Sequence, residues 1–288
     1  NPYGKWIKDN MAELEEIEAR EKLNSNVLTA LKVFGYTRED LKIILQPMIE
    51  SGKEPIGSMG NDTPHAILSK RPQLLYAYFK QLFAQVTNPA IDPIREKIVM
   101  SLESCIGPEG NLLDETPEHC HKLRVKRPIL TNEELEKVRS IKINSFKTKT
   151  ISMLFSVNKK DDFIKAIDRI CKEAVSAIKE GYTFIILSDR GVDEKHSSLP
   201  ALLAVGALHH HLVKKSLRNQ IGIIMESGEP REVHHFALLF GYGADCVNPY
   251  LAYEAVKHIV KENGLSLDFA KAVYNYIHAV EEGILKIL

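Results

Sequence analysis

The chain has 288 residues, which is enough for one large domain or two modest ones with a sizeable buried core. Lysine plus arginine total 38 and aspartate plus glutamate total 38, so the formal net charge is zero. This balance gives no overall electrostatic drive toward nucleic acid or an anionic membrane. The longest apolar stretches also fall far short of the ~20 residues that span a bilayer. We therefore expect neither a nucleic-acid partner nor a membrane partner.

The first 148 residues predict a mainly helical region with irregular loops. Apolar positions at helical spacing over 11–23 predict an amphipathic helix. Thr37 with Asp40 predicts a helix start that runs toward Gly52, and Arg71-Pro72 predicts another helix over 71–83. Two stretches rich in glycine, proline and asparagine, 54–64 and 106–111, predict loops or linkers.

A capping-box pattern, Thr131 with Glu134, predicts one more helix before the rhythm of the chain changes near residue 150. From 149 to 288 strands and helices alternate. The predicted strands are 151–156, 183–187, 221–225 and 244–247. Helices are expected over 161–179 and 198–215, and from residues 230, 249 and 267. This order predicts an α/β fold with a parallel sheet, either open or an incomplete, TIM-barrel-like (β/α) unit.

Polar side chains follow three of the predicted strands. Asp189 and Arg190 come after 183–187, Glu226 comes directly after 221–225, and Asn248 comes after 244–247. Arg231 and Glu232 lie shortly beyond Glu226. Ligands of parallel α/β folds bind at these strand ends, so Glu226 and Asp189 are acid/base candidates and Arg190 and Arg231 are candidate anion clamps. The alternative is that acid–arginine pairs cross-link neighbouring strand ends, and we interpret the cluster as structural. No catalytic residue is assigned.

Cysteines and histidines do not form a metal-binding pattern. Cys105, Cys120, Cys171 and Cys246 are far apart, which indicates neither a zinc site nor a disulfide framework and favours a reducing cytoplasm. Neighbouring histidines at 209–211 and 234–235 point about 100° apart on a helix, so they cannot chelate one ion. The group at 119–121 also fails the spacing of a zinc site. We expect no metal here.

One loop has the composition of a phosphate-binding turn without its motif. It consists of Gly57, Ser58, Met59, Gly60, Asn61, Asp62 and Thr63. The loop lacks the Gly-Lys-Ser/Thr ending of a P-loop, so we interpret it as a rigid turn that presents backbone amides and hydroxyls to a neighbour.

Long stretches of the chain resemble the central domain of glutamate synthase. The most specific is ESGEPREVHHFA at 226–237, together with GSMGNDTP at 57–64. Other matching runs lie at 78–89, 91–96, 107–113, 188–190, 202–212 and 241–244. The resemblance spans nearly the whole chain, and it implies that both ends were cut from a longer enzyme. On this interpretation 1–148 and 149–288 are two parts of one central domain.

The resemblance implies a role in glutamate biosynthesis from glutamine and 2-oxoglutarate. The family's central domain links a glutaminase domain to an FMN-binding domain and helps to wall an ammonia tunnel. Cofactors of the full enzyme, FMN and a 3Fe-4S cluster, would lie outside this fragment. The implied partners are those two domains and either a small NADPH-dependent subunit or ferredoxin. The implied location is the cytoplasm, or the plastid in a photosynthetic eukaryote.

A tunnel for ammonia needs small residues and neutral hydrogen-bonding groups, so Gly57 to Thr63 is the expected tunnel or domain-interface segment. A turn that only locks the two halves together remains the alternative. A second functional alternative is a flavin- or phosphate-binding barrel enzyme that uses the loops around Asp189 and Glu226. A third is an independent scaffold protein.

Overall fold

The computed structural model describes residues 2–17, 27–55, 64–80, 99–111, 113–262 and 267–287. They form two compact units that alternate along the chain. Unit 1 consists of Asn1–Asn26, Glu103–Glu229 and Leu239–Leu251, and unit 2 of Val27–Leu102, Pro230–Leu238 and Ala252–Leu288. The sequence predicted one boundary, at residue 148, between a helical part and a part with alternating strands and helices. That division describes the types of element along the chain, and it stays a prediction.

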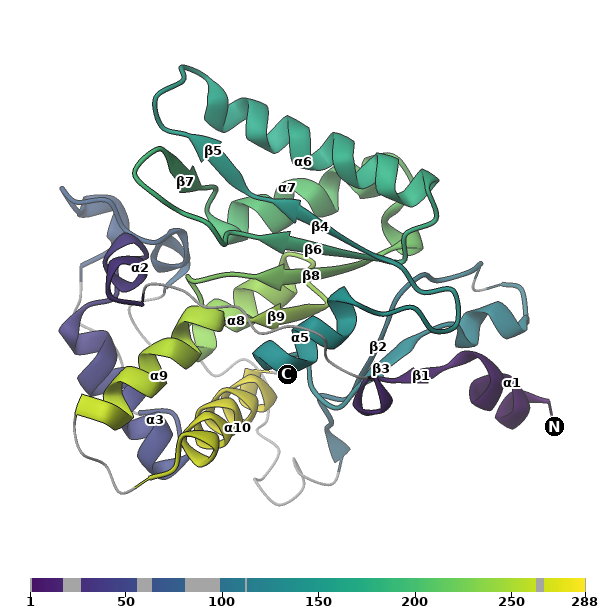
Figure 1. Ribbon diagram of the computed structural model, residues 1–288, viewed down its shortest axis with the longest axis horizontal. Coiled ribbons are helices and arrows are strands. Elements are labelled where there is room, and N and C mark those ends of the chain that lie inside the picture. Colours follow the sequence, from purple (N-terminus) through teal and green to yellow (C-terminus); the bar gives the residue numbers. More distant parts are fainter. Residues whose placement is uncertain are drawn as a thin grey trace. The chain divides into compact units, whose positions relative to one another are not determined.

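Unit 1 contains a four-stranded parallel sheet (Figure 1). Its strands are β4 (Thr148–Ser152), β6 (Phe184–Ser188), β8 (Gly222–Glu226) and β9 (Cys246–Asn248). They pair in the order β4-β6-β8-β9, so each strand lies beside the next one along the chain. Sequential order is that of a (β/α) barrel, whereas a doubly wound sheet reverses its order at a switch point. The expected α/β fold with an incomplete barrel-like unit is therefore confirmed.

Burial explains why these residues form the sheet. Every residue of β6, β8 and β9 is buried, as expected for strands covered on both faces. Helix α6 (Asp162–Lys179) connects β4 to β6, α7 (Ala201–Lys214) connects β6 to β8, and the two helices pack side by side. On the other side, Phe184, Ile186 and Ile224 share a core with Leu135 and Val138 of α5 (Asn132–Arg139). Gly181, at φ 76°, follows α6 in the left-handed conformation that favours glycine.

Unit 1 also contains two small sheets whose pairing the sequence did not predict, and the predicted strand 151–156 is divided between the end of β4 and one of them. Strand β3 (Leu123–Val125) pairs with β1 (Ala12–Glu13) in parallel and with β2 (Ser104–Ile106) in antiparallel fashion. Strand β5 (Leu154–Ser156) pairs with β7 (His196–Ser198). The remaining elements are α1 (Tyr3–Asn10), η1 (Leu14–Glu16), η5 (Pro117–Cys120) and η6 (Arg218–Gln220).

Unit 2 is built from helical segments. Its first part has α2 (Val27–Val33), the π-helical turn η2 (Asp40–Leu45), α3 (Gln46–Ser51), and the 3₁₀ segments η3 (Ala66–Leu68) and η4 (Leu75–Phe79). Most of α9 (Tyr250–Glu262), all of α10 (Phe269–Ile287) and the first residues of α8 (Val233–Gly241) complete it. Helix α10 packs on α3, where the amide of Asn275 donates to the carbonyl of Ile49 at 2.8 Å.

Both predicted helix caps are confirmed. The Asp40 amide donates to the Thr37 hydroxyl at 3.1 Å, and Thr131 and Glu134 form a complete capping box at the start of α5. The predicted helix over 11–23 is wrong in its described part, because Ala12 and Glu13 pair with β3 and a 3₁₀ turn follows. Of the predicted helix at 71–83, the structure describes residues 71–80, and in these only a short 3₁₀ segment forms, over 75–79. No described helix is both long enough and apolar enough to span a membrane.

Candidate functional site

The carboxyl ends of the parallel strands lie in register. Ser152 pairs with Ser188, Ser188 with Glu226, and Glu226 with Asn248. This alignment follows from the parallel pairing, and it brings the polar residues that end each strand to one edge of the sheet. Asp189, Arg190 and Glu226 therefore meet in unit 1, as their positions predicted.

Glu226 is the centre of a buried ion triad. Its side chain is 1% exposed, and its carboxylate accepts a hydrogen bond from Arg139 Nη2 at 2.8 Å and another from Arg190 Nε at 2.5 Å. Burial opposes ionisation, but the two arginines outweigh it and lower the pKa of Glu226 below its ordinary value. The carboxylate is thus ionised and engaged on both oxygens, which suits a structural tie better than a proton acceptor.

Each arginine of the triad has further partners. Arg139 also contacts Glu136 through Nε at 3.0 Å and Thr150 through Nη1 at 2.7 Å. The guanidinium of Arg190 lies over the ring of Tyr250, 4.0 Å from its centre. Both guanidinium groups are therefore tied to Glu226, although Arg190 uses only Nε for this bond and its side chain is 21% exposed.

Asp189 fastens the loop that follows β8. Its carboxylate accepts hydrogen bonds from the Ser227 hydroxyl at 2.5 Å, the Gly228 amide at 3.0 Å and the hydroxyl of Tyr250. Burial, with a smaller contribution from Glu229, raises the pKa of Asp189 to about 7 despite these donors. The group is 1% exposed, so its partners come from the protein itself.

Asn248 cross-links the last strand to Leu130 and to the first residue of α5. Its amide nitrogen donates to the carbonyl of Leu130 at 2.9 Å and to Asn132 Oδ1 at 3.1 Å. Its own Oδ1 is buried and accepts no hydrogen bond from the residues that the structure describes. The side chain is 0% exposed and acts within the protein core.

Arg231 and Glu232 belong to a different cluster, in unit 2. Arg231 lies 3.6 Å from Asp40, and Glu232 contacts His235 at 3.1 Å and Lys80 at 3.5 Å. The five residues predicted as one strand-end cluster therefore separate into a group of three and a group of two. The predicted channel segment, Gly57 to Thr63, lies outside the described residues.

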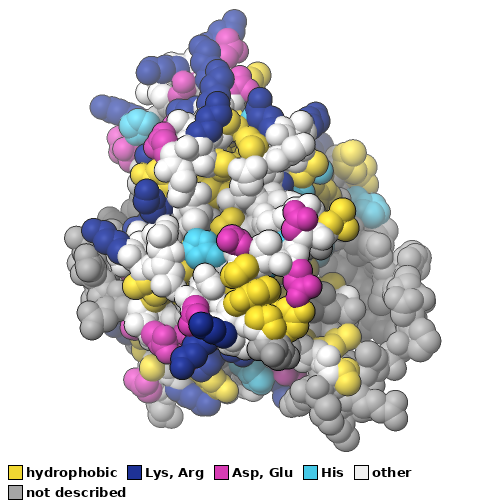
Figure 2. All heavy atoms as spheres, turned by 90° about the vertical axis from the view of Figure 1, so that its right-hand side faces the viewer, with side chains coloured by type: hydrophobic (Ala, Val, Ile, Leu, Met, Phe, Trp, Pro, Cys, Tyr) yellow, Lys and Arg dark blue, Asp and Glu magenta, His cyan; other side chains and the backbone are white. Residues whose placement is uncertain are grey.

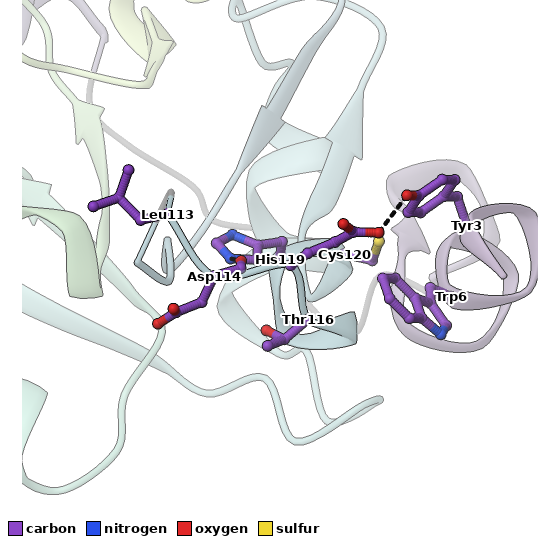
Figure 3. A pocket seen from close by; sticks show the side chains of 8 residues that line it. Tyr3, Trp6, Leu113, Asp114, Thr116, His119 and Cys120 are labelled. Atoms are coloured by element: carbon purple, nitrogen blue, oxygen red, sulfur yellow. Dashed lines mark hydrogen bonds between the residues drawn. The ribbon is translucent and has the colours of Figure 1, made fainter.

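An open cavity of about 500 Å³ lies beside α1 in unit 1 (Figure 3). Tyr3 and Trp6 form part of its wall, and the Tyr3 hydroxyl donates to Glu115. Figure 3 shows the sulfur of Cys120 turned toward the two aromatic rings, while the imidazole of His119 lies toward Asp114, whose carbonyl it contacts at 2.7 Å. Cys120 and His119 consequently do not form a nucleophile–base pair.

The surface around this cavity is chemically mixed. Tyr3 and Ile7 of α1 are each 47% exposed. On the side of the molecule that α1 occupies, Figure 2 shows a small group of hydrophobic side chains among acidic and basic ones. Such a surface has no single charge that would select a polyanion.

Histidines of the described residues serve separate structural contacts. His121 contacts the carbonyl of Asn144 and stacks on Phe146, with ring centres 4.2 Å apart. His209 accepts a hydrogen bond from Arg218 at 3.1 Å. No group of three or more potential ligands that could hold a metal ion occurs in the ranges that the structure describes.

Two residues of the strand-end network were missed from sequence. Arg139 reaches Glu226 across 87 positions of sequence, from a helix that precedes the sheet. Tyr250 lies two residues after the last strand and contacts both Asp189 and Arg190. The capping box located the helix of Arg139, but no local signal indicated which way that arginine would point.

Comparisons with known proteins place the chain in a family. The family model described as "Glutamate synthase central domain" matches residues 29–288. The chain is 44% identical over its whole length to the "Glutamate synthase (NADPH) large chain" of Bacillus subtilis, of which it covers 19%. It is 47% identical over 269 residues to "Glutamate synthase (NADH)" of Schizosaccharomyces pombe, covering 88% of this chain and 12% of that protein.

A plant relative is similar at the same level. The chain is 40% identical, again over its whole length, to "Ferredoxin-dependent glutamate synthase 1, chloroplastic/mitochondrial" of Arabidopsis thaliana, and covers 19% of it. The chain thus spans about a fifth or less of the length of these relatives. Among solved structures, a flavocytochrome b2 variant with pyruvate bound has a TM-score of 0.35 and 15% identity, covering 58% of this chain and 37% of that one. Similarity of that size supports no inference, whereas the family match is extensive: the chain belongs to the glutamate synthase central domain family.

Proposed function

We propose that this chain acts as the central, non-catalytic part of a glutamate synthase polypeptide. In that role it joins the glutaminase domain to the FMN-binding domain and helps to wall the passage for ammonia between them. The complete polypeptide would be an oxidoreductase that transfers the amide nitrogen of glutamine to 2-oxoglutarate. This chain would supply framework and passage, and the chemistry would occur in the neighbouring domains.

The observation that carries the proposal is the neutralised strand edge of unit 1. A (β/α) enzyme exposes reactive groups there, at the carboxyl ends of its strands. In this chain Glu226 is held by Arg139 and Arg190, and Asp189 is held by Ser227, Gly228 and Tyr250. Because both carboxylates are buried and already bonded, they are not available to a substrate.

Cofactors fit the rest of the polypeptide better than this chain. FMN carries a phosphate that needs positively charged donors, whereas Arg139 and Arg190 at the strand edge already bind Glu226. A 3Fe-4S cluster needs thiolates that converge, but Cys171 and Cys246 are buried on α6 and β9 and Cys105 is exposed on β2. The described residues therefore do not fit either group, and we place both cofactors in other domains.

The electron donor and the cellular compartment depend on which form of glutamate synthase contains this chain. A small NADPH-dependent subunit or ferredoxin would supply electrons to the flavin domain. The cytoplasm would be the location, with the plastid as the location in a photosynthetic eukaryote. The plant relative named above has a chloroplastic/mitochondrial name, which agrees with the second case.

The first test asks whether the strand edge is catalytic. In the full-length polypeptide, Glu226→Gln should lower thermal stability but leave the turnover per folded enzyme within about threefold of the wild-type value. General acid–base catalysis is worth roughly 10²- to 10⁴-fold, so loss of a catalytic carboxylate would have a far larger effect. A fall of 100-fold in glutamate formation at unchanged stability would reject the proposal.

The second test addresses the passage. Ser58→Leu places a branched apolar side chain in the predicted tunnel segment, and we expect glutamine hydrolysis to exceed glutamate formation in the full-length enzyme. Ser58→Ala is the matched control, because it removes the hydroxyl without adding bulk. Equal coupling in wild type, Ser58→Ala and Ser58→Leu would show that this segment does not wall the passage.

A third measurement distinguishes the alternative of a flavin-binding barrel. FMN is added to the chain and the visible spectrum of bound flavin is recorded after gel filtration. We expect no flavin to remain with the protein. Stoichiometric retention would overturn the assignment of FMN to another domain.

A further inference from the structure

A cavity of about 510 Å³ lies entirely within unit 2 and has no part in the proposed role of the chain. Its walls come from the segments around α2 and η4 and from the residues just before α8. Phe34, Leu74 and Ala77 supply apolar surface, and five charged side chains reach it. Ligand pockets in proteins are typically about 300–1,000 Å³ in volume, mostly apolar, with a few placed polar groups. The cavity matches that description.

Arg231 is the most deeply buried of the charged residues in its wall. The side chain is 5% exposed, and its guanidinium lies 4.2 Å from the centre of the Tyr36 ring. Nη1 donates to the carbonyl of Phe34 at 3.1 Å and Nη2 donates to that of Gly35 at 3.2 Å. Nη2 also lies 3.6 Å from the Asp40 carboxylate, so the charge of Arg231 is paired. Nε is buried, has no hydrogen-bond partner among the described residues, and does not face the open space of the cavity.

The wall carries one more positive charge than negative. Arg71, Lys80 and Arg231 are the cations, and Asp40 and Glu232 are the carboxylates. Arg71 has no side-chain partner among the residues that the structure describes. Its charge is therefore available to a ligand.

His235 does not change this balance. Burial lowers its pKa, and contact with Glu232 offsets this only in part. Its Nδ1 accepts the backbone N–H of Arg231 at 3.3 Å, so the proton is on Nε2, which lies 3.1 Å from Glu232. A neutral imidazole bonded in this way leaves the excess charge at one.

Both carboxylates of the wall are already engaged. Asp40 accepts the Thr37 amide at 2.8 Å, and Glu232 contacts both His235 and Lys80. Although burial opposes ionisation, these neighbours and Arg231 lower the pKa of Glu232 to about 2. The two fixed negative charges disfavour a phosphate dianion, whereas a single carboxylate neutralises the excess positive charge.

We propose that this cavity binds a small organic molecule that carries one carboxylate group. The carboxylate lies against the Lys80 ammonium and the Arg71 guanidinium, both of which line the cavity. The uncharged remainder of the molecule packs on Phe34, Leu74 and Ala77. Such a ligand would act at a place separate from the strand edge of unit 1, and its binding does not depend on the proposed function.

The test measures binding to defined probes by titration calorimetry and by the shift in melting temperature. Benzoate and hexanoate are the carboxylate probes, benzamide and hexanamide are their uncharged counterparts, and inorganic phosphate is the competing anion. We expect each carboxylate to bind at least about tenfold more tightly than its amide, which corresponds to about 1.4 kcal/mol. Phosphate should bind more weakly than either carboxylate.

Variants link the binding to this cavity. Ala77→Leu adds a larger side chain that occupies part of the cavity, so it should abolish binding. Ala66→Leu, on η3 and outside the cavity, should not change the affinity. Lys80→Met should weaken the carboxylates about threefold to tenfold, and Lys70→Met should leave their affinity unchanged. Melting curves of all four variants establish that each is folded, so the result does not depend on the buried Arg231.

Three outcomes would overturn the proposal. They are the absence of binding by both carboxylates, equal affinity for carboxylate and amide, and undiminished binding to Ala77→Leu. Measurements on the 288-residue chain and on the full-length polypeptide separate a free ligand from a side-chain carboxylate of another domain. Binding to the former but not to the latter would show that the polypeptide fills the cavity itself, and would reject a free small molecule as the occupant.

Discussion

Replacing Glu226 with glutamine tests the buried ion triad directly. Glutamine has nearly the same shape, but it carries no charge and can accept a hydrogen bond from only one of the two arginines. Removing one partner of a buried ion pair costs about 3–5 kcal/mol. Arg139 keeps Glu136 and Thr150, and Arg190 keeps its contact with Tyr250. Because these contacts remain, we expect a loss of roughly 2–3 kcal/mol in the free energy of unfolding at pH 7.

The assay is urea unfolding followed by circular dichroism, with Glu173→Gln as the matched control. Glu173 forms an exposed pair with Arg169, in which both side chains are 38% exposed, so its loss should cost about 0–0.5 kcal/mol. The pKa of Glu226 is lowered in the folded state, so its contribution is fully present above the ordinary pKa of about 4.5 and declines as the pH falls through the lower folded value. The difference between Glu226→Gln and wild type should therefore stay constant from pH 8 to about 5.5 and narrow below about pH 4.5. A difference under about 0.5 kcal/mol at neutral pH, or one that persists unchanged in acid, would refute the reasoning.

Three further predictions concern single contacts. Asp189→Asn should flatten the pH dependence of the melting temperature, since a pKa raised to about 7 makes wild-type stability fall between about pH 4 and 7; an unchanged slope would contradict this. Gly283→Ala should cost about 1–3 kcal/mol, because a Cβ there would lie 2.4 Å from Val233 Cγ2, and Val233→Ala should restore part of the loss. Its control is Gly241→Ala, which has open space, so equal melting temperatures for the two alanine variants would disprove the clash. Thr131→Ala should cost about 1 kcal/mol in thermal unfolding by removing the cap of α5, and a change under 0.3 kcal/mol would show that the cap is dispensable.

Local patterns predicted the elements whose causes are local. The caps of Thr37 and Thr131 depend on contacts between residues three positions apart. The continuous apolar runs of β6 and β8 have the composition of strands that are buried on both faces. By contrast, Ala12 and Glu13 lie in a strand because Leu123 and Arg124 lie beside them. Strand pairing between residues more than a hundred positions apart determined the structure here, despite the helical spacing of the apolar residues. A window of twenty residues contains no signal of such a pairing.

The strand-end cluster was predicted as far as parallel register alone determines it. Asp189 and Arg190 directly follow β6 and Glu226 is the last residue of β8, so the pairing of β6 with β8 necessarily brings them together. Arg231 and Glu232 follow the same strand but lie beyond Pro230, where the chain enters unit 2 and where Arg231 contacts Asp40. Proximity to a strand end therefore predicted membership of the cluster correctly for residues one or two positions beyond a strand, but not for Arg231, five positions beyond Glu226.

The two carboxylates at the strand edge show how an electrostatic signature of catalysis can arise without a site. The pKa of Glu226 is lowered and that of Asp189 is raised to about 7, and neighbouring carboxylates with opposite shifts are a mark of acid–base pairs. A catalytic pair must also face a space that a substrate can enter, but each of these side chains is 1% exposed, and neither lines the cavities described above. The two arginines explain the lowered pKa of Glu226, and burial explains the raised pKa of Asp189. The same burial that makes the edge resemble an active site is what closes it to a substrate.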